Sequence, residues 1–402
     1  MRRPRDQRRQ RGVALLMVLI ALTILGAMTA DFMETNEVYL ANAVNQRDAV
    51  KAEYLARSGV NLSRLLLSLQ PIFGKSINFP FWQYADLLMA PFSGSGGGGL
   101  MTDLVGLDLS MAEGIGLRED ESFAVAIVDE DSKINVNLAN NERMRQRMVQ
   151  QLSMLVAPME YDELFDRIGE RADGVEREEI ICEIIDWGDP DEERCDRSGS
   201  EDPSYYTGTE PEYERKNAPF DSLEELHFVH GVDDDFWSAF VDPVPEDPER
   251  RVMTVWGKGR VNVNTAPAQV LFSLVCMLST DESGMSPCLD PYQRLNLLQV
   301  LQGVVMIRTF MPFGKISDFI AAIENPEERL FLPIPGFPVL QKRLARQTMT
   351  TQSTVFSIYS EGTVRNATKR IHTVIDVEGV DMLDPTKSVA ASGGSVLYWR
   401  MR

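Results

Sequence analysis

The stretch "RRQRGVALLMVLIALTILGAMTA" (residues 8–30) joins a cluster of arginines to an uncharged apolar run, with Gly12 at the join. As a helix, residues 13–30 are about 27 Å long, which is enough to span the hydrocarbon core of a membrane. The arginines favour a cytoplasmic N-terminus and send the rest of the chain outward. The stretch is therefore either a lasting anchor or a secretory signal cut after Ala30, where small residues could be cleaved.

The helical pattern continues beyond this apolar run. Residues 31–69 contain no proline and a single glycine, Gly59, and their apolar residues recur at helical spacing. The sequence predicts one helix of about 55 residues over 13–69, with residues 13–30 in the membrane and the rest outside it.

The rest of the chain is strongly acidic. The first 12 residues carry a charge of +5, from six arginines and one aspartate, whereas the 402-residue chain has a net charge of −20. The remaining residues therefore carry −25. A body of this charge repels phosphate backbones, so nucleic acid is excluded as a partner.

Strand patterns appear late in the chain, and one appears earlier. Alternating runs at 353–364, 367–379 and 394–402 are separated by turn signals, and 121–137 contains a similar strand. Between them, "KINVNLAN" (133–140) is echoed by "GRVNVNTAP" (259–267), and each leads into helix-rich sequence. We expect two short strands that pair at the necks of two helical units.

Residues 185–206 form a dense acidic segment. Such carboxylates repel one another unless a cation lies between them, and Ca²⁺ accepts oxygen ligands in flexible geometry. The EF-hand spacing is absent, and a solvated acidic loop is the alternative. Four cysteines form two local pairs, Cys182 with Cys195 and Cys276 with Cys288. These pairs are the simplest disulfides in an oxidising compartment, and four reduced, buried thiols are the alternative.

Catalytic motifs are missing from the sequence. No GxSxG, Walker or GxGxxG motif lies at a strand–helix junction, and no third metal ligand accompanies the two histidines of "HFVH" (227–230). We therefore expect that the chain is not an enzyme.

The basic leader ending in Gly12, followed by the long apolar helix, resembles type IV prepilins and type II secretion pseudopilins. The segments "INVN", "VNVNTAPAQVL", "IIDWGDPDEERCDRSGSEDPSYY" and "VLYWRMR" are similar to the general secretion pathway protein K family, the K-type minor pseudopilins. The resemblance implies cleavage between Gly12 and Val13 by a prepilin peptidase and N-methylation of Val13. Most relatives carry glutamate at the fifth mature position, where this chain has Met17, and its absence marks the subunit at the filament tip.

The same resemblance implies an α+β fold in which a large helical domain interrupts a pilin-like long helix and antiparallel sheet. The expected parts are a leader (1–12), a helix (13–69, with 13–30 transmembrane), an α/β body (70–130 and 350–402) and an inserted domain (131–349). The insert would consist of two units, about 131–258 and 259–349. One or two calcium ions would lie in it, held by Asp186, Asp189, Asp191, Glu201 and Asp202.

The function implied is a minor pseudopilin that caps the type II secretion pseudopilus, initiates its assembly and supports export of folded proteins. Its partners would be the I and J minor pseudopilins, the prepilin peptidase, the inner-membrane assembly platform and a secreted substrate. The chain would cross the bacterial inner membrane once, with a periplasmic body. Two alternatives stay open: a tip pilin or adhesin of a type IV pilus, and a signal-anchored periplasmic calcium-binding receptor.

Overall fold

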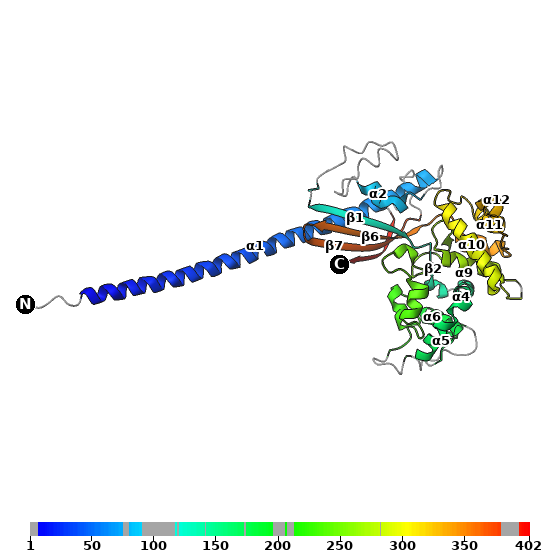
Figure 1. The fold of residues 1–402 in the computed structure, drawn as a ribbon, viewed down its shortest axis with the longest axis horizontal. Helices are drawn as coiled ribbons and strands as arrows, with labels where there is room; N and C mark the ends of the chain where they lie inside the picture. Colours follow the sequence, from blue (N-terminus) through cyan, green and yellow to red (C-terminus); the bar gives the residue numbers. More distant parts are fainter. Residues whose placement is uncertain are drawn as a thin grey trace, which may run out of the picture.

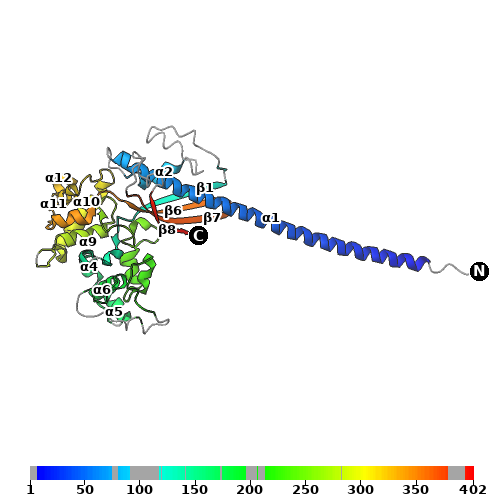
Figure 2. The ribbon, with the colours of Figure 1, turned by 180° about the vertical axis from the view of Figure 1, so that it is seen from behind.

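A long helix projects from one end of a body that contains a sheet and a helical domain (Figure 1). The inserted helical domain lies at the end opposite the N-terminus, which the view from behind also shows (Figure 2). The computed structural model describes residues 7–74, 80–90, 117–118, 120–140, 142–172, 174–195, 206, 213–281, 283–378 and 394–402.

The long helix and one antiparallel sheet form the first part of the body. The helix α1 (Gln7–Gly74) is continuous, and η1 (Phe81–Tyr84) and α2 (Ala85–Met89) follow it. The sheet has the order β1-β6-β7-β8, and every neighbouring pair is antiparallel. Its strands are β1 (Glu121–Asp129), β6 (Val355–Val364), β7 (Ala367–Asp376) and β8 (Ser395–Met401). The expected combination of a long helix and an antiparallel sheet is therefore confirmed.

A strip of small residues lets α1 approach the sheet closely. Ala52, Ala56 and Ser63 are fully buried on the sheet-facing side of the helix. Opposite them, an ideal Cβ placed on Gly362 of β6 would lie 2.1 Å from the carbonyl oxygen of Ala52. The Ser360 hydroxyl donates to the carbonyl of Ala56 at 2.8 Å. This packing depends on the absence of a side chain at Gly362, because the facing atoms belong to the helix backbone.

The inserted domain consists of two helical units and has its own hydrophobic core, separate from the core between α1 and the sheet. The first unit contains β2 (Ile134–Asn135), η4 (Val136–Asn140), α4 (Glu142–Val156), η5 (Met159–Tyr161), α5 (Asp162–Arg171), α6 (Arg177–Gly188), η6 (Leu223–Phe228), α8 (Asp234–Phe236), η7 (Trp237–Val241), η8 (Pro248–Arg250) and β3 (Met253–Thr254). The second contains β4 (Val261–Asn262), α9 (Ala268–Leu278), η9 (Pro287–Leu289), α10 (Pro291–Arg308), α11 (Ile316–Glu324), α12 (Pro326–Leu330), α13 (Lys342–Thr348) and β5 (Met349–Thr350).

Each helical unit is closed by its own pair of short parallel strands. In the first unit β2 pairs with β3, and in the second β4 pairs with β5. Short strands therefore do pair at both necks, but the two Asn-Val-Asn segments do not pair with each other. The physical reason is that the chain enters and leaves each unit at the same place, so the first and last strands of the unit lie side by side.

The asparagines of the repeated motif have the same role in both units. The amide group of Asn137 donates to the carbonyls of Phe220 and Val255 and accepts from the main-chain N–H of Phe220. Asn264 makes the corresponding three bonds, to the carbonyls of Phe313 and Thr351 and from the N–H of Phe313. The sequence echo is therefore a structural repeat in which one asparagine side chain joins two distant loops.

Three consecutive carboxylates are buried where the sheet meets the inserted domain. Asp129 Oδ2 accepts from Ser353 and, on the inserted side, from Asn262 (3.2 Å) and Thr265 (2.5 Å). Glu130 accepts from Thr254 of β3, Ser357 of β6 and the Lys133 ammonium. Asp131 accepts from the main-chain N–H groups of Thr354 and Val355. We name these three residues the acidic triplet.

The members of the acidic triplet differ in protonation because only one of them has a buried cation as partner. Burial and then the neighbouring Asp131 raise the pKa of Asp129 to about 7. Burial also raises the pKa of Asp131. Burial opposes ionisation of Glu130 as well, but Lys133 and the two hydroxyl donors outweigh it and lower the pKa of Glu130. The triplet therefore holds fewer than three negative charges near neutral pH.

The close approach of α1 to β6 predicts that Gly362→Ala destabilises the fold. The new methyl group would meet helix backbone at Ala52 and Ala56, which cannot rotate away. We expect a loss of about 3 kcal/mol or more in the free energy of unfolding, measured by chemical denaturation of the full chain in detergent. Gly314→Ala is the matched control, because an ideal Cβ there has nothing within 4 Å. Equal effects of the two variants would contradict this account of the packing.

The acidic triplet predicts a specific pH dependence of stability. The pKa of Asp129 lies above its ordinary value of 3.8 in the folded chain, so between about pH 4 and 7 the folded chain binds the proton more tightly than the unfolded chain. The contribution of Asp129 to stability therefore falls as the pH rises through this window, by at most about 1.4 kcal/mol per pH unit.

We expect Asp129→Asn to remove this slope, so that the stability of the variant relative to wild type increases between pH 4 and 7. Denaturation of the full chain at several pH values measures the difference, in which the titration of all other groups largely cancels. Asp166→Asn, at an exposed position of α5, serves as the control. A difference between Asp129→Asn and wild type that stays constant with pH would refute the assignment.

Candidate functional site

The first half of α1 is an apolar helix without contacts to the body. Every large apolar side chain between residues 13 and 40 is exposed, and Met17 is 66% exposed. Length and composition make the helix suitable for crossing a membrane. An apolar surface of this extent is stable only in lipid or against other apolar helices. The helix is therefore built for contacts outside the chain itself.

Gly12, Val13 and Met17 lie on this one continuous helix. From Val13 to Ala30 the helix carries no charged side chain, and the first acidic residue after the apolar run is Asp31. Met17 carries a flexible, uncharged thioether, which needs no charged partner in lipid. The side chains of residues 1–11, the predicted leader up to Gly12, lie outside the described part of the structure.

The acidic segment begins within α6 and continues past its end. Asp186 is buried in the last turn, and Asp189, the first residue after the helix, is fully buried. Arg145 of α4 donates from Nη1 to Oδ2 of Asp189 and to Oδ2 of Asp191, both at 2.8 Å. The main-chain N–H of Glu193 donates to the other oxygen of Asp191 at 2.9 Å. A cation therefore does lie between two of the carboxylates, and it is an arginine.

The two carboxylates that share Arg145 have opposite pKa shifts. Burial raises the pKa of Asp189, although the bond from Arg145 opposes this. Asp191 is less buried, and the N–H of Glu193 and Arg145 overcome its desolvation and lower its pKa. Within the described residues, Oδ1 of Asp189 is buried and has no hydrogen-bond partner. An additional cation or a donor at this oxygen would stabilise the ionised form of Asp189.

The five predicted calcium ligands are only partly placed. Asp186, Asp189 and Asp191 lie together at the end of α6, whereas Glu201 and Asp202 lie outside the described residues. In the described part of the chain, no group of three or more His, Cys, Asp or Glu side chains has metal-binding geometry. The donor chemistry of Asp189 still suits a hard cation, because its Oδ1 atom is a buried carboxylate oxygen without a partner there.

Sequence reasoning missed Arg145. It precedes Asp189 by 44 residues, on a different helix, and no spacing pattern connects the two. Only the packing of α4 against α6 brings the guanidinium to these carboxylates.

The four cysteines are joined in two disulfides in the structure, Cys182–Cys195 and Cys276–Cys288. The first ties α6 to the acidic segment beyond it, and the second ties α9 to η9 immediately before α10. Each bond closes a short loop. In the chain-entropy model, a loop of this size contributes roughly 3 kcal/mol to stability.

Comparison with known proteins gives two findings. Residues 132–241, the greater part of the first helical unit, match the family model described as type II secretion system (T2SS), protein K. A chain in the crystal structure of the GspK-GspI-GspJ complex from the enterotoxigenic Escherichia coli type 2 secretion system is similar in fold. The two chains share 17% sequence identity with a TM-score of 0.50, over 90% of this chain and 99% of that one. No curated protein matches the sequence.

The domain match and the shared fold agree with the motifs that pointed to this family. The matched residues include the first Asn-Val-Asn neck and the whole acidic segment, residues 185–206. The fold likeness covers 90% of this chain. As the sequence motifs predicted, residues 132–241 match protein K of the type II secretion system, and the fold of the chain is similar to that of a chain in the GspK-GspI-GspJ complex.

Proposed function

We propose that this minor pseudopilin caps the tip of the type II secretion pseudopilus and initiates its assembly. The observation that carries the proposal is the position of the two-unit helical domain, which lies beyond the sheet at the end opposite the apolar helix (Figure 1). A filament of such subunits buries the helices in its interior, so a broad domain at the far end leaves no room for a further subunit above it. The chain therefore suits a position that begins a filament and does not suit one within it.

The partners in this proposal are the I and J minor pseudopilins. The protein of similar fold was crystallised in a GspK-GspI-GspJ complex, which supports the same association here. The exposed apolar part of α1 supplies a surface for packing beside equivalent helices. In this role the chain is structural and performs no catalysis. A cytoplasmic ATPase would supply the work through the inner-membrane platform, and the tip would support export of folded proteins across the outer membrane.

Processing and location follow from the same proposal. A prepilin peptidase would cut between Gly12 and Val13 and methylate the new amine. The helix would then stay in the inner membrane as a single-pass anchor, with the body in the periplasm, until assembly moves it into the filament. The two disulfides are compatible with that oxidising compartment.

Met17 gives the most direct test of the tip position. In related filaments, the glutamate at this position is thought to pair with the amino terminus of the subunit ahead. A tip subunit has nothing ahead of it, so an ionised glutamate at position 17 would be unpaired in lipid at a cost of about 3 kcal/mol. We expect Met17→Glu to reduce pseudopilus number and secretion, measured by filament counts and exoprotein assays in cells that contain the complete secretion system.

Met17→Gln is the matched control, because it adds a polar group of the same size without a charge. Mass spectrometry of the mature chain checks processing, and both variants should begin at N-methylated Val13. Unchanged initiation in Met17→Glu would remove the support for a tip position. A wild-type chain that keeps Met1 or begins at Asp31 would contradict the pseudopilin processing itself.

We also propose that the acidic segment holds one or two calcium ions. Oδ1 of Asp189, which has no hydrogen-bond partner among the described residues, and the neighbouring Asp191 supply carboxylate oxygens of the kind that Ca²⁺ prefers. Asp186, Glu201 and Asp202 are the further ligands that the family resemblance implies. A bound ion would supply positive charge to this segment and join the end of α6 to the residues that follow it.

The calcium proposal predicts that millimolar Ca²⁺ raises the melting temperature of the full chain in detergent, compared with chelator. Calcium at about 100 times its Kd should stabilise the folded state by about 2.7 kcal/mol. Asp189→Asn should abolish this increase, whereas Glu163→Gln, at an exposed position on α5, should leave it intact. An unchanged melting temperature in wild type would refute the site, and an equal response to Mg²⁺ would refute its selectivity.

A further inference from the structure

The last strand of the sheet has an edge that no other described strand covers. β8 occupies the end of the order β1-β6-β7-β8, and among the described residues no strand pairs with its outer side. Its apolar side chains are unusually exposed for a strand: Val396 (46%), Leu397 (45%), Trp399 (42%) and Met401 (42%). Proteins usually protect such an edge with lysine, proline or a covering segment, because an open edge pairs with other chains. Four exposed apolar residues offer no such protection.

The pairing of β8 with β7 shows which main-chain groups face outward. Arg402 and Arg370 exchange two main-chain hydrogen bonds, at 2.9 and 3.0 Å. Residues alternate in an antiparallel pair, so Arg400 and Arg402 bond inward while the N–H and C=O groups of Trp399 and Met401 point away from β7. The edge therefore offers regularly spaced donors and acceptors to an added strand.

The two faces of β8 differ in chemistry. Arg400 lies opposite His372 and Tyr398 opposite Val374, so Tyr398, Arg400 and Arg402 share the sheet face that points away from α1. Trp399 and Met401 lie opposite Thr373 and Ile371 and share the other face, whereas Leu397 stands at a register shift and has no partner on β7. A strand added to this edge would meet a cationic face on one side and an apolar face on the other.

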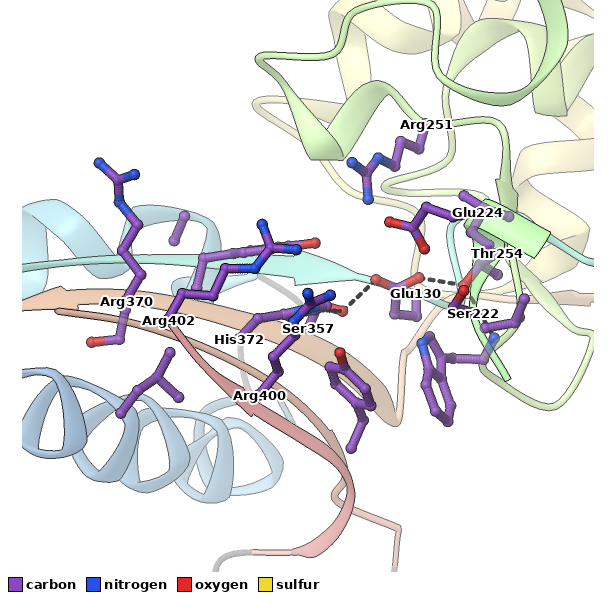
Figure 3. A pocket seen from close by; sticks show the side chains of 18 of the residues that line it. Glu130, Ser222, Glu224, Arg251, Thr254, Ser357, Arg370, His372, Arg400 and Arg402 are labelled. Atoms are coloured by element: carbon purple, nitrogen blue, oxygen red, sulfur yellow. Dashed lines mark hydrogen bonds between the residues drawn. The ribbon is translucent and has the colours of Figure 1, made fainter. Parts of the chain in front are cut away.

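The cationic face borders a cavity of about 750 Å³ between the sheet and the inserted domain. Figure 3 shows Arg370, Arg400 and Arg402 on the sheet side, and Glu130, Thr254 and Arg251 toward the inserted domain. Most charged residues in this region are paired: Arg370 with Glu361, Arg251 with Asp242, and Lys133 with Glu130. Within the described part of the chain, Arg400 and Arg402 have no carboxylate partner.

The cavity wall beside these arginines is formed by aromatic, uncharged side chains. His372 stacks on Tyr359 with ring centroids 4.3 Å apart, and Tyr398 lies 5.3 Å from His372. Burial lowers the pKa of His372 to about 4, so the imidazole is uncharged at neutral pH. The positive charge of this face therefore comes from the arginines and not from the histidine.

We propose that the outer edge of β8 binds an extended segment of another protein whose side chains alternate between acidic and apolar. The segment would continue the sheet through main-chain bonds to Trp399 and Met401. Its acidic side chains would lie opposite Arg400 and Arg402, and its apolar side chains beside Trp399 and Met401. The proposal concerns the body of the protein and does not depend on the tip position.

Charge complementarity favours this occupant over a second copy of the same strand. Two copies of β8 would bring Arg400 and Arg402 of one chain near those of the other, and like charges on paired strands destabilise a sheet. An acidic strand would instead neutralise two arginines that lack a carboxylate partner among the described residues. The exposed aromatic and aliphatic side chains add apolar area, and each favourable cross-strand pair contributes about 0.2–1 kcal/mol.

The test is binding of a fluorescent eight-residue peptide, alternating glutamate and valine, to the full chain in detergent, followed by anisotropy. We expect saturable binding that weakens with salt, and no binding of a lysine–valine peptide. The double variant Arg400→Glu/Arg402→Glu should lose about tenfold or more in affinity and should now bind the lysine–valine peptide. Arg343→Glu/Arg346→Glu on α13 changes the net charge equally at exposed positions and should behave as wild type.

Hydrogen exchange then locates the bound peptide. The amides of Trp399 and Met401 should gain protection, whereas the amide of Arg400, which already faces β7, should not change. A peptide with proline at alternate positions should bind weakly, because it lacks the necessary N–H groups. The proposal would be overturned if the glutamate–valine peptide did not bind, or if it bound the Arg400→Glu/Arg402→Glu variant as tightly as wild type. Protection of amides elsewhere in the chain instead of at Trp399 and Met401 would also overturn it. If a peptide without acidic residues bound β8 as tightly as the glutamate–valine peptide, the charge specificity would be refuted.

Discussion

Asp129, Glu130 and Asp131 are buried between the sheet and the inserted domain, and the rest of the body depends on how their charges are accommodated. A buried carboxylate is costly unless donors surround it. Here the donors come from Ser353 and Ser357 near the sheet and from Thr254, Asn262 and Thr265 in the insert. Neither part alone can satisfy these carboxylates, so their burial fixes the two parts relative to each other.

The two Asn-Val-Asn necks extend this junction into the helical units. Each unit begins at such a neck, returns to it through a parallel two-stranded pairing, and uses one asparagine amide to hold two loops together. The long, mostly helical insert can therefore leave the sheet after β1 and rejoin it at β6 without disturbing the strand pairing. The sheet stays free to pack against α1, and the apolar half of α1 stays free for partners outside the chain.

Much of this plan can be predicted from local patterns. The apolar run, the absence of proline before residue 70 and the alternating strands near the end indicate a long helix and an antiparallel sheet. The repeated Asn-Val-Asn motif indicates two similar units, but it does not tell which strands pair. The same limit applies to the acidic segment, where the density of carboxylates suggests a nearby cation but does not identify Arg145.

The sequence by itself determined the elements whose signals are local: the membrane-length helix, the strands, the neck motifs, the acidic segment and the cysteine pairs. Only the tertiary structure decided which distant groups meet, namely Gly362 with the α1 backbone, Arg145 with Asp189, and the acidic triplet with donors more than 100 residues away. The physical reason is that helix and strand periodicity depend on neighbours within a few residues. Burial and hydrogen-bond satisfaction depend instead on segments that come together only when the whole chain packs.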